Sequence, residues 1–312
     1  MKGYLGSRYH FWLVGFFLCF VIFAGCQSYQ QQKDSLSDTP TRGRILISAD
    51  ESFKPIIDAQ IQVYESNYPG TTIAVQYKPE AECLKDLLTD SVRVVIATRR
   101  ASVQEERLIV DSLKMAPSQL TVARDAVAVI VHPDAEDSIF TMDELKEVLR
   151  GKFKKNLIPV FDGVQATSTV RYIVDSVLHD DSLTPRAMAA RTSEEVINYV
   201  AGHPDAVGLI GVSWIGNKDD ADQLSFLKKV KIAQIESTDV PGGYVLPVQL
   251  NIYMKRYPMV RDLVYILKEK HKGLGHGFTD FLSGNIGQLI FRRAYLVPAR
   301  KKFILRPVQL RE

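Results

Sequence analysis

The chain has 312 residues, of which 46% are hydrophobic and 24% charged, and 39 basic against 36 acidic side chains give a formal net charge of +3. This length suits about two domains with a real core, and the apolar fraction is that of a globular protein rather than a disordered or fibrous one. The near-neutral charge disfavours nucleic acid as the main partner, because nucleic-acid-binding domains usually carry a marked excess of Lys and Arg. Three cysteines are too few for a disulfide scaffold.

The first 25 residues are typical of a secretory signal peptide. Two basic residues precede an unbroken apolar run from Phe11 to Phe23, and two small residues then lead to Cys26. A transmembrane anchor is the alternative, but the run is shorter than the roughly 18 residues that span a bilayer. The tetrapeptide Phe-Ala-Gly-Cys also resembles the bacterial lipoprotein signal. That resemblance implies that residues 1–25 are removed and that Cys26 becomes the lipid-modified first residue.

Residues 26–43 lack apolar periodicity and are rich in Gln, Ser, Asp and Thr, so we expect a flexible tether between the membrane and the folded part. If Cys26 is lipidated and Cys19 leaves with the signal peptide, Cys83 is the one remaining thiol. Cys83 falls on a predicted helix, which favours a core position over chemistry.

From residue 44 onward, short apolar runs typical of buried strands alternate with helical patterns. The expected strands in this part cover 45–47, 73–77, 92–97 and 120–122, and the expected helices lie at about 53–64, 83–88 and 103–113. Strands that alternate with helices predict parallel pairing and an α/β fold.

The pattern begins again near residue 126. Expected strands cover 126–131, 157–161, 207–212, 230–235 and 246–254, and expected helices cover about 141–149, the stretch after Thr169, 192–200, 259–270, 278–282 and 286–295. Capping boxes open two of these helices, at Thr141 and Thr192. Two α/β units without a Gly/Ser linker predict two lobes that share a cleft. Residues 44–123 with 245–312 form the first lobe and residues 124–244 the second.

The chain contains no motif of a nucleophile or a metal centre. It lacks H-E-x-x-H, Cys-x-x-Cys, G-x-S-x-G, the Walker A loop and a G-x-G-x-x-G after a strand. The loop from His271 to His276 is a weak metal candidate, because lone surface histidines are common. We therefore expect a protein that is not an enzyme and that needs no cofactor or metal.

Small hydroxyl residues twice follow a strand at the start of a helix. Ser52 and Phe53 come after the first strand, and Thr167, Ser168 and Thr169 come after the strand that ends at residue 161. Helix N-termini leave N–H groups unpaired and carry the positive end of the helix dipole, so they hold tetrahedral oxyanions. Each motif alone is equally an ordinary N-cap. Their recurrence in both lobes favours an anion site.

Arginines fall at the same strand ends. Arg99 and Arg100 follow the strand 92–97, and Arg171 lies in the first turn of the helix after Thr169. Ligands of doubly wound sheets sit off the carboxyl ends of strands, and a guanidinium offers two donors to an oxyanion. Surface ion pairs with Glu105 or Asp175 are the alternative.

These segments together resemble the substrate-binding component of ABC-type phosphate uptake systems, in the phosphate-binding-protein-like group of two-lobed periplasmic binding proteins. The resemblance covers about residues 44–298, and its most specific piece is DAVAVIVHPD followed by FTMDELKEVLRGK, with ILISADESFKPII, RVVIATRRAS and GVQATSTVRYIVDSV in support. It implies a type II binding-protein fold, with a mostly parallel sheet flanked by helices in each lobe and phosphate held in the cleft.

The family's site is only partly matched. Ser52 and Phe53 stand where the family has a hydroxyl residue and Phe, and residues 167–169 replace its Ser-Gly-Thr. Residues 78–82 replace a Gly/Ser-rich loop, Arg100 takes the place of the family's acid, and the arginine before Ser-Gly-Thr is absent. The acceptor for the proton of phosphate would then come from one of four acids, namely Asp50, Glu51, Glu80 or Glu82.

The sequence thus predicts a lipid-anchored binding protein, facing the periplasm in the envelope of a Gram-negative-like bacterium, that delivers an oxyanion, above all phosphate, to an ABC-type permease in the inner membrane. The predicted ligand-binding residues are Ser52, Phe53, Thr167, Ser168, Thr169, Arg99, Arg100 and Arg171. The rival interpretation is an envelope interaction module on the same fold that has lost or changed its ligand, which the stiff, acidic loop 78–82 favours. The membrane leaflet and the oligomeric state stay open.

Overall fold

A computed structural model describes residues 38–163, 167–179, 181–217 and 219–300. The predicted signal peptide, Cys26 and most of the predicted tether lie outside these residues.

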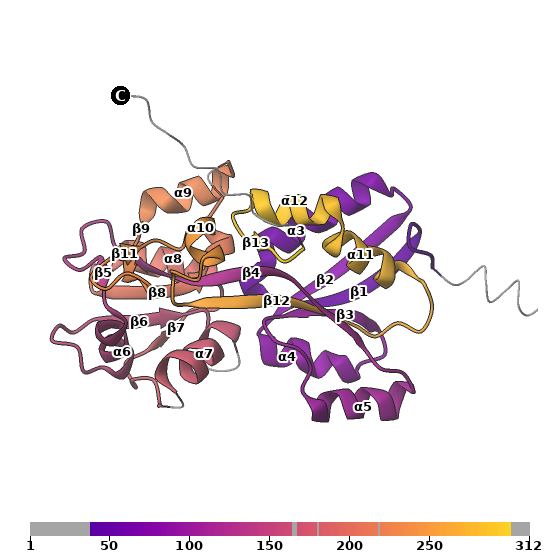
Figure 1. Ribbon diagram of the computed structural model, residues 1–312, viewed down its shortest axis with the longest axis horizontal. Helices are drawn as coiled ribbons and strands as arrows, with labels where there is room; N and C mark the ends of the chain where they lie inside the picture. Colours follow the sequence, from indigo (N-terminus) through magenta and orange to yellow (C-terminus); the bar gives the residue numbers. More distant parts are fainter. Residues whose placement is uncertain (1–37, 164–166, 180, 218, 301–312) are drawn as a thin grey trace, which may run out of the picture.

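Two halves lie side by side and are joined by two long strands, β4 (Ser118–Val131) and β12 (Val260–Leu267), as Figure 1 shows. We call the half that contains β1 (Gly43–Asp50) lobe 1 and the half that contains β8 (Ala206–Gly211) lobe 2. The strand β4 passes through the predicted lobe boundary at 123/124 without a break, so the exact division of the chain stays a prediction.

One sheet runs through both lobes in the order β2-β1-β3-β12-β4-β8-β6-β7. The pairs β2–β1–β3 and β8–β6–β7 are parallel, as expected, whereas β12 and β4 pair antiparallel with their neighbours in the middle. The remaining strands of this sheet are β2 (Thr71–Lys78), β3 (Val92–Ala97), β6 (Ile158–Phe161), β7 (Met188–Ala189), β9 (Lys231–Ile232) and β13 (Val297–Pro298). A small second sheet joins β5 (Ile139–Phe140), β10 (Gln234–Glu236) and β11 (Tyr244–Val245).

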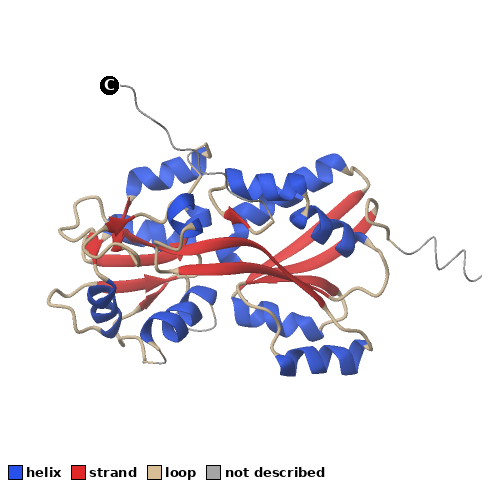
Figure 2. Ribbon diagram, viewed as in Figure 1, coloured by secondary structure: helices blue, strands red, loops and turns tan. Residues whose placement is uncertain are grey.

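Helices cover both faces of the sheet in each lobe (Figure 2). In lobe 1, α4 and α5 lie on one face and α3, α11 and α12 on the other (Figure 1). The bounds of these helices are α3 (Lys54–Asn67), α4 (Glu80–Lys85), α5 (Val103–Leu113), α11 (Leu274–Ser283) and α12 (Asn285–Arg293). The helices around lobe 2 are α6 (Met142–Arg150), α7 (Ser168–Tyr172), α8 (Ser193–Gly202), α9 (Ala221–Lys229) and α10 (Gln249–Tyr253). Short 3₁₀ turns η1 (Glu51–Phe53), η2 (Asp86–Leu88) and η4 (Val212–Trp214) and the π-helical η3 (Ile173–Leu178) complete the fold.

The first strand and helix show why these residues form a layered core. Ile45, Ile47 and Ala49 alternate along β1 and are buried, and Ile57 and Tyr64 of α3 pack in the same core cluster. A period of two for the strand and of three to four for the helix puts the apolar faces together. Cys83 of α4 is buried and has no disulfide partner in the described chain, which confirms its predicted core position.

The helix expected around β12 was wrong, whereas the strands expected around β4 are confirmed except for the break between them. Expected strands 120–122 and 126–131 form one strand, and the expected helix 259–270 is the strand β12. Charged residues interrupt both apolar runs, but the register pairs Asp125 with Arg261 and Arg124 with Asp262. Tertiary pairing thus overrides the local pattern, because each charge meets its counter-charge across the strands.

The expected long strand 246–254 was also wrong. Here β11 ends at Val245 and the short helix α10 follows at Gln249. Ile252 is buried in the core while Leu250 is exposed, so one turn of helix suffices to bury the apolar side. Short apolar runs do not distinguish a strand from a helix without their tertiary contacts.

Candidate ligand-binding site

The first part of the site is the turn after β1. The Asp50 side chain accepts a hydrogen bond from the backbone N–H of Ser52 at 2.9 Å and so caps η1. Pro55 in the first turn of α3 then starts the helix without an unpaired donor. This turn directs Ser52 towards lobe 2, where its Oγ donates to Asp162 Oδ2 at 3.2 Å and lies 3.3 Å from Ser168 Oγ.

The second part is the start of α7 in lobe 2. Thr167 caps the helix by accepting from the N–H of Val170, and Thr167, Ser168 and Thr169 are all buried. The hydroxyls of Ser168 and Thr169 face the Ser52 side of the interface rather than solvent. The two predicted hydroxyl motifs are therefore brought together between the lobes.

An arginine that the sequence reasoning missed lies at the centre of this site. Arg261 of β12 donates from Nη1 to Ser168 Oγ at 2.9 Å and to Thr169 Oγ1 at 3.3 Å. Its Nε and Nη2 lie 3.0 and 2.9 Å from Asp125 Oδ2 on β4, and its Cζ is 5.0 Å from the centre of the Phe53 ring. A signal existed, since Arg261 interrupts the apolar run of residues 259–267, but the expected helix concealed its partner.

Gly211 at the end of β8 lets the backbone of lobe 2 approach this pair. A Cβ atom at that position would lie 2.8 Å from Arg261 Nη2, 3.1 Å from Asp125 Oδ2 and 3.2 Å from the Ser52 carbonyl oxygen. A side chain here would force the buried pair apart, so the position needs glycine. We call Ser52, Ser168, Thr169 and Arg261 the cradle.

Three buried carboxyl groups surround the cradle, namely Asp50, Asp125 and Asp162. Burial raises the pKa of Asp50 to about 7, although the positive charge of Arg261 opposes the shift. Burial raises the pKa of Asp125 and of Asp162 too, again against the effect of Arg261. Removal from water disfavours a charged carboxylate, and one guanidinium offsets only part of that cost for three of them.

Several buried polar atoms of these residues lack a hydrogen-bond partner within the described chain. At this site they are Asp50 Oδ2, Asp125 Oδ1, Asp162 Oδ1, Arg261 Nη2 and, nearby in η4, Trp214 Nε1. Unpaired buried polar atoms are costly and therefore rare in folded proteins, and a ligand bound at this interface would satisfy such a group. The cradle offers donors to an oxyanion, and the carboxylate oxygens accept from a ligand's own protons.

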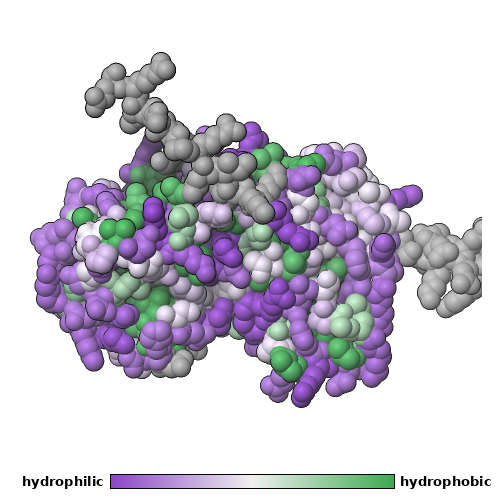
Figure 3. Space-filling model, viewed as in Figure 1, coloured by the Kyte–Doolittle hydropathy of each residue, from purple (hydrophilic) through white to green (hydrophobic). Residues whose placement is uncertain are grey.

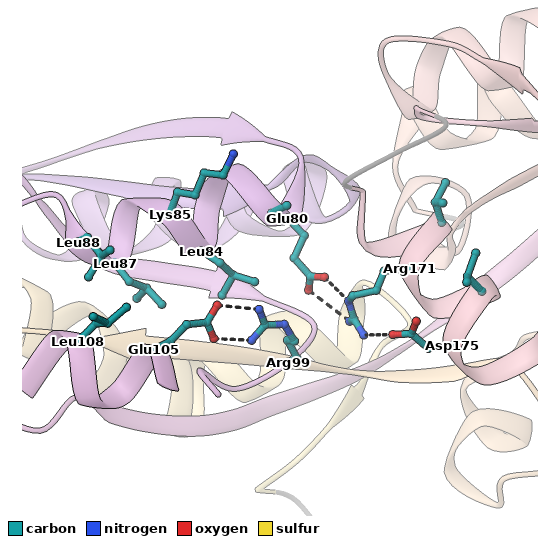
Figure 4. Close-up of a pocket in the computed structure, with 13 residues that line it drawn as sticks. Glu80, Leu84, Lys85, Leu87, Leu88, Arg99, Glu105, Leu108, Arg171 and Asp175 are labelled. Atoms are coloured by element: carbon teal, nitrogen blue, oxygen red, sulfur yellow. Dashed lines mark hydrogen bonds and ion pairs between the residues drawn. The ribbon is translucent and has the colours of Figure 1, made fainter. Parts of the chain in front are cut away.

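The predicted arginines occupy other positions. Arg171 of α7 reaches across to lobe 1, where its Nε donates to Glu80 Oε2 at 2.6 Å (Figure 4). Its Nη2 also donates to Thr98 Oγ1 at 2.6 Å. Arg99 pairs with Glu105 inside lobe 1, and Arg100 is exposed. None of the three contacts the cradle in the described structure.

Glu80 and Arg171 form the inner wall of a cavity of about 600 Å³ between α4, α5 and α7. The rest of its lining combines apolar side chains such as Leu84, Leu88 and Leu108 with charged ones, namely Lys85, Arg99, Glu105 and Asp175 (Figure 4). Figure 3 shows the corresponding notch in the outline of the molecule between the two lobes. Thr98 also donates to Glu80 through its N–H and its hydroxyl, so Glu80 is fully engaged.

The other predicted acceptors are also accounted for. Glu51 accepts from the N–H and the hydroxyl of Ser193 at the start of α8 in lobe 2, and Glu82 is exposed. Of the four acids, only Asp50 combines burial at the cradle with an unpaired oxygen. The sequence reasoning did not weigh Asp125 or Asp162 as acceptors.

The histidine loop does not form an open metal site. Ligand atoms of Asp38, Glu269 and His271 lie within 4.8 Å of one another. However, Arg93 Nη1 lies 2.6 Å from Asp38 and 2.7 Å from Glu269, and backbone N–H groups of α11 donate to both acids. The carboxylates of Asp38 and Glu269 are therefore already paired with the Arg93 guanidinium and with backbone N–H groups at the start of α11.

Among the described residues, no helix is long and apolar enough to cross a membrane.

Comparison with known proteins places the chain among binding proteins. It is 24% identical over 280 residues to the phosphate-binding protein PstS of Bacillus subtilis, which covers 84% of each chain. A solved structure from Clostridium perfringens with bound phosphate, assigned to phosphate ABC transport, superposes with a TM-score of 0.67 at 18% identity, over 82% of this chain and all of that one. An ABC-type phosphate transport receptor from Vibrio cholerae gives a TM-score of 0.60 at 18% identity, over 81% and 99% of the two chains.

These matches confirm the predicted two-lobed binding-protein fold and the resemblance on which it was based. The sequence profile of the PBP superfamily domain matches residues 35–285. Since this is most of the 312 residues, the chain belongs to the PBP superfamily.

Proposed function

We propose that this protein binds a phosphate-type oxyanion, inorganic phosphate above all, between its lobes and delivers it to an ABC-type permease. The observation that carries the proposal is the convergence of three hydroxyls and one guanidinium, from η1, α7 and β12, in one buried cradle. The names of the relatives in Bacillus subtilis and Vibrio cholerae support the same role. The proposed role is binding without catalysis.

Asp50 and Asp162 are the proposed acceptors for the proton that phosphate carries at neutral pH. Both are buried at the cradle, and each has one oxygen without a partner in the described chain. Fully ionised sulfate has no proton to donate and would leave these oxygens unpaired, so the site should reject it.

Binding requires the lobes to separate. Ser52 Oγ and Ser168 Oγ are 3.3 Å apart, so the hydroxyls now contact each other where an anion would lie between them. The strands β4 and β12 cross between the lobes and are the natural place for the bend.

Isothermal titration with phosphate and sulfate tests the proposal. We expect phosphate to bind and sulfate not to. Ser52→Ala and Thr169→Ala should each weaken binding about tenfold, and the double variant more than either, since each removes one donor from opposite lobes. Ser66→Ala is the matched control, because Ser66 is an exposed hydroxyl of α3 outside the site. Unchanged affinity in the double variant contradicts the assignment.

The membrane attachment belongs to the same proposal. Lipidation at Cys26 would hold the binding protein near its permease at the periplasmic side, with the segment up to residue 43 as the tether. The rival role as an interaction module is not favoured, because Lys78 pairs with Asp86 and Glu80 with Arg171. Most of the charge in the loop 78–82 is thus engaged inside the protein and does not face the cradle.

A further inference from the structure

Exposed basic side chains gather at one end of lobe 1. Arg42 and Arg44 stand at the start of β1, and Lys270 and Lys272 follow the end of β12. Only β3 separates these two strands in the sheet, and β12 runs antiparallel to it, so the end of β12 lies at the same edge as the start of β1 (Figure 1). Two strand spacings are about 10 Å. We call these four residues the basic end.

The basic end keeps an excess of positive charge. None of its four residues has an ion pair among the described residues. Two acids nearby, Asp38 and Glu269, both pair with Arg93, at 2.6 and 2.7 Å. Asp90, just before β3, is an exposed acid, whereas the four residues before β2 and the four before β4 include no acid. The free charges at this end are therefore mostly positive.

The predicted tether is held against lobe 1 at the same end. Asp38 accepts from the backbone N–H of Leu274 at 2.5 Å, and its Oδ1 lies 3.2 Å from Nε2 of His271, which stands between the two lysines. Only the eleven residues 27–37 separate Asp38 from Cys26. A chain of that length spans at most about 40 Å when fully extended. A lipid on Cys26 would therefore keep the basic end close to the bilayer.

We propose that the basic end rests on anionic phospholipid headgroups and so sets the orientation of the protein on its membrane. The inference rests on the membrane attachment in the proposed function, because the tether is what brings the basic end to the bilayer. Guanidinium and ammonium groups are attracted to the phosphates of an anionic surface, and the attraction falls off within a Debye length of about 8 Å. Contact between the basic end and the headgroups is therefore direct and sensitive to salt.

This orientation leaves the binding site free. The strand β1 leads from the basic end to Asp50 at the cradle, and its eight residues span about 26 Å. Lobe 2 lies on the far side of the cradle from the basic end (Figure 1). The membrane thus holds lobe 1 while lobe 2 can move, and the reversible contact describes the protein between its encounters with the permease.

Amine labelling tests this on the full chain, purified from the membrane fraction and reconstituted on vesicles. One vesicle is pure phosphatidylcholine, and the other is an equal mixture of phosphatidylcholine and phosphatidylglycerol. We expect Lys270 and Lys272 to label at least about fivefold more slowly on the anionic vesicles, and to recover at high salt. Lys152 and Lys228, exposed lysines of lobe 2, are the internal controls and should label equally on both.

The double variant Arg42→Gln with Arg44→Gln removes half of the positive charge from the basic end and should weaken the protection of the two lysines. Both arginines are exposed, so the fold should tolerate the change. Lys152→Gln with Lys154→Gln removes the same charge from the surface of lobe 2 and is the matched control, which should keep the protection. Phosphate affinity should be the same in both variants.

Equal labelling of Lys270 and Lys272 on the two vesicles, or full protection in the arginine double variant, overturns the orientation. If the chain nevertheless floats with both kinds of vesicle, the anchor in the proposed function stands and only the basic end fails. A chain that floats with neither vesicle overturns both. Titration of the same preparation with phosphate tests ligand binding separately from either outcome.

Discussion

Asp50 ends β1 and Glu51 begins η1, and these two adjacent acids face different parts of the molecule. Asp50 caps its own turn in lobe 1, whereas Glu51 crosses the interface and accepts two hydrogen bonds from Ser193 at the start of α8. Burial raises the pKa of each carboxyl to about 7, and neighbouring acids add to the shift. At the residue scale, closing the lobes buries both carboxyl groups, and burial disfavours their charged form. Ionisation of these groups therefore opposes closure.

This competition predicts a pH dependence of stability. The pKa of Glu51 is about 7 in the folded chain against 4.5 for the unfolded one, so the folded state binds the proton more tightly. Its contribution to the free energy of unfolding is complete below pH 4.5 and is lost as the pH rises to about 7. Glu51→Gln keeps an acceptor for Ser193 without the charge.

Urea denaturation of both proteins at pH 5 and pH 8 measures the effect. Relative to Glu51→Gln, the wild-type chain should lose on the order of 2 kcal/mol between the two pH values, after screening by solvent. Acids whose pKa is lowered, such as Asp86 and Glu269, change the stability of both proteins equally with pH, so their contributions cancel in the comparison. A difference between the two proteins that is the same at both pH values would contradict this role of Glu51.

At the scale of elements, α4 and α7 face each other across the cleft and are joined by Glu80 and Arg171. The carboxylate of Glu80 is buried and holds Thr98 on its own side, while Arg171 is about one-third exposed. Arg171 holds the pKa of Glu80 below its usual range, although burial opposes the shift. The pair therefore stabilises the closed arrangement of the lobes.

Glu80→Gln should shift the molecule towards a more open form. The amide oxygen can still accept from Thr98, but the charge that attracts Arg171 is gone, at a cost on the order of 1–3 kcal/mol to the closed form. Small-angle X-ray scattering of the ligand-free chain should show a larger radius of gyration.

Glu105→Gln is the control for that experiment, because Glu105 pairs with Arg99 by two contacts of 2.7–2.8 Å inside lobe 1. It removes an ion pair of the same kind without touching the interface, so its radius of gyration should equal that of the wild type. An increase in both variants, or in neither, would show that α4 and α7 do not hold the lobes together.

At the scale of the whole molecule, the proposed link between the folded part and the membrane is a segment known from the sequence alone. We expect Cys26→Ser to move the protein from the membrane fraction to the soluble fraction, because stable attachment depends on acyl chains that the serine cannot carry. Mass spectrometry should find acyl groups on Cys26 of the wild type and none on the variant. Cys83→Ser, at the buried thiol of lobe 1, should leave the membrane fraction unchanged wherever it folds.

Much of the fold could be predicted from local pattern. The strands β1, β2 and β3, the helices at 141–149, 192–200, 278–282 and 286–295, and the two hydroxyl motifs were all predicted, because each is coded by apolar periodicity and caps within about ten residues. The strand β12 was predicted as a helix, and the helix α10 was predicted as a strand. A short apolar run is compatible with either structure until its tertiary neighbours are known.

The sequence by itself determined the alternation of strands and helices, the paired hydroxyl residues at Ser52 and Ser168, and the family resemblance. Only the tertiary structure decided which charges serve the site. Arg261 and Asp125 are 136 residues apart, and the register between β4 and β12 joins them. Arg99 and Arg100 were expected to lie close to the hydroxyl motifs. In the structure Arg99 pairs with Glu105 and Arg100 is exposed to solvent. Local sequence encodes caps and periodicity, but a buried charge is placed by the partner that compensates it, and that partner is known only once the strands have paired.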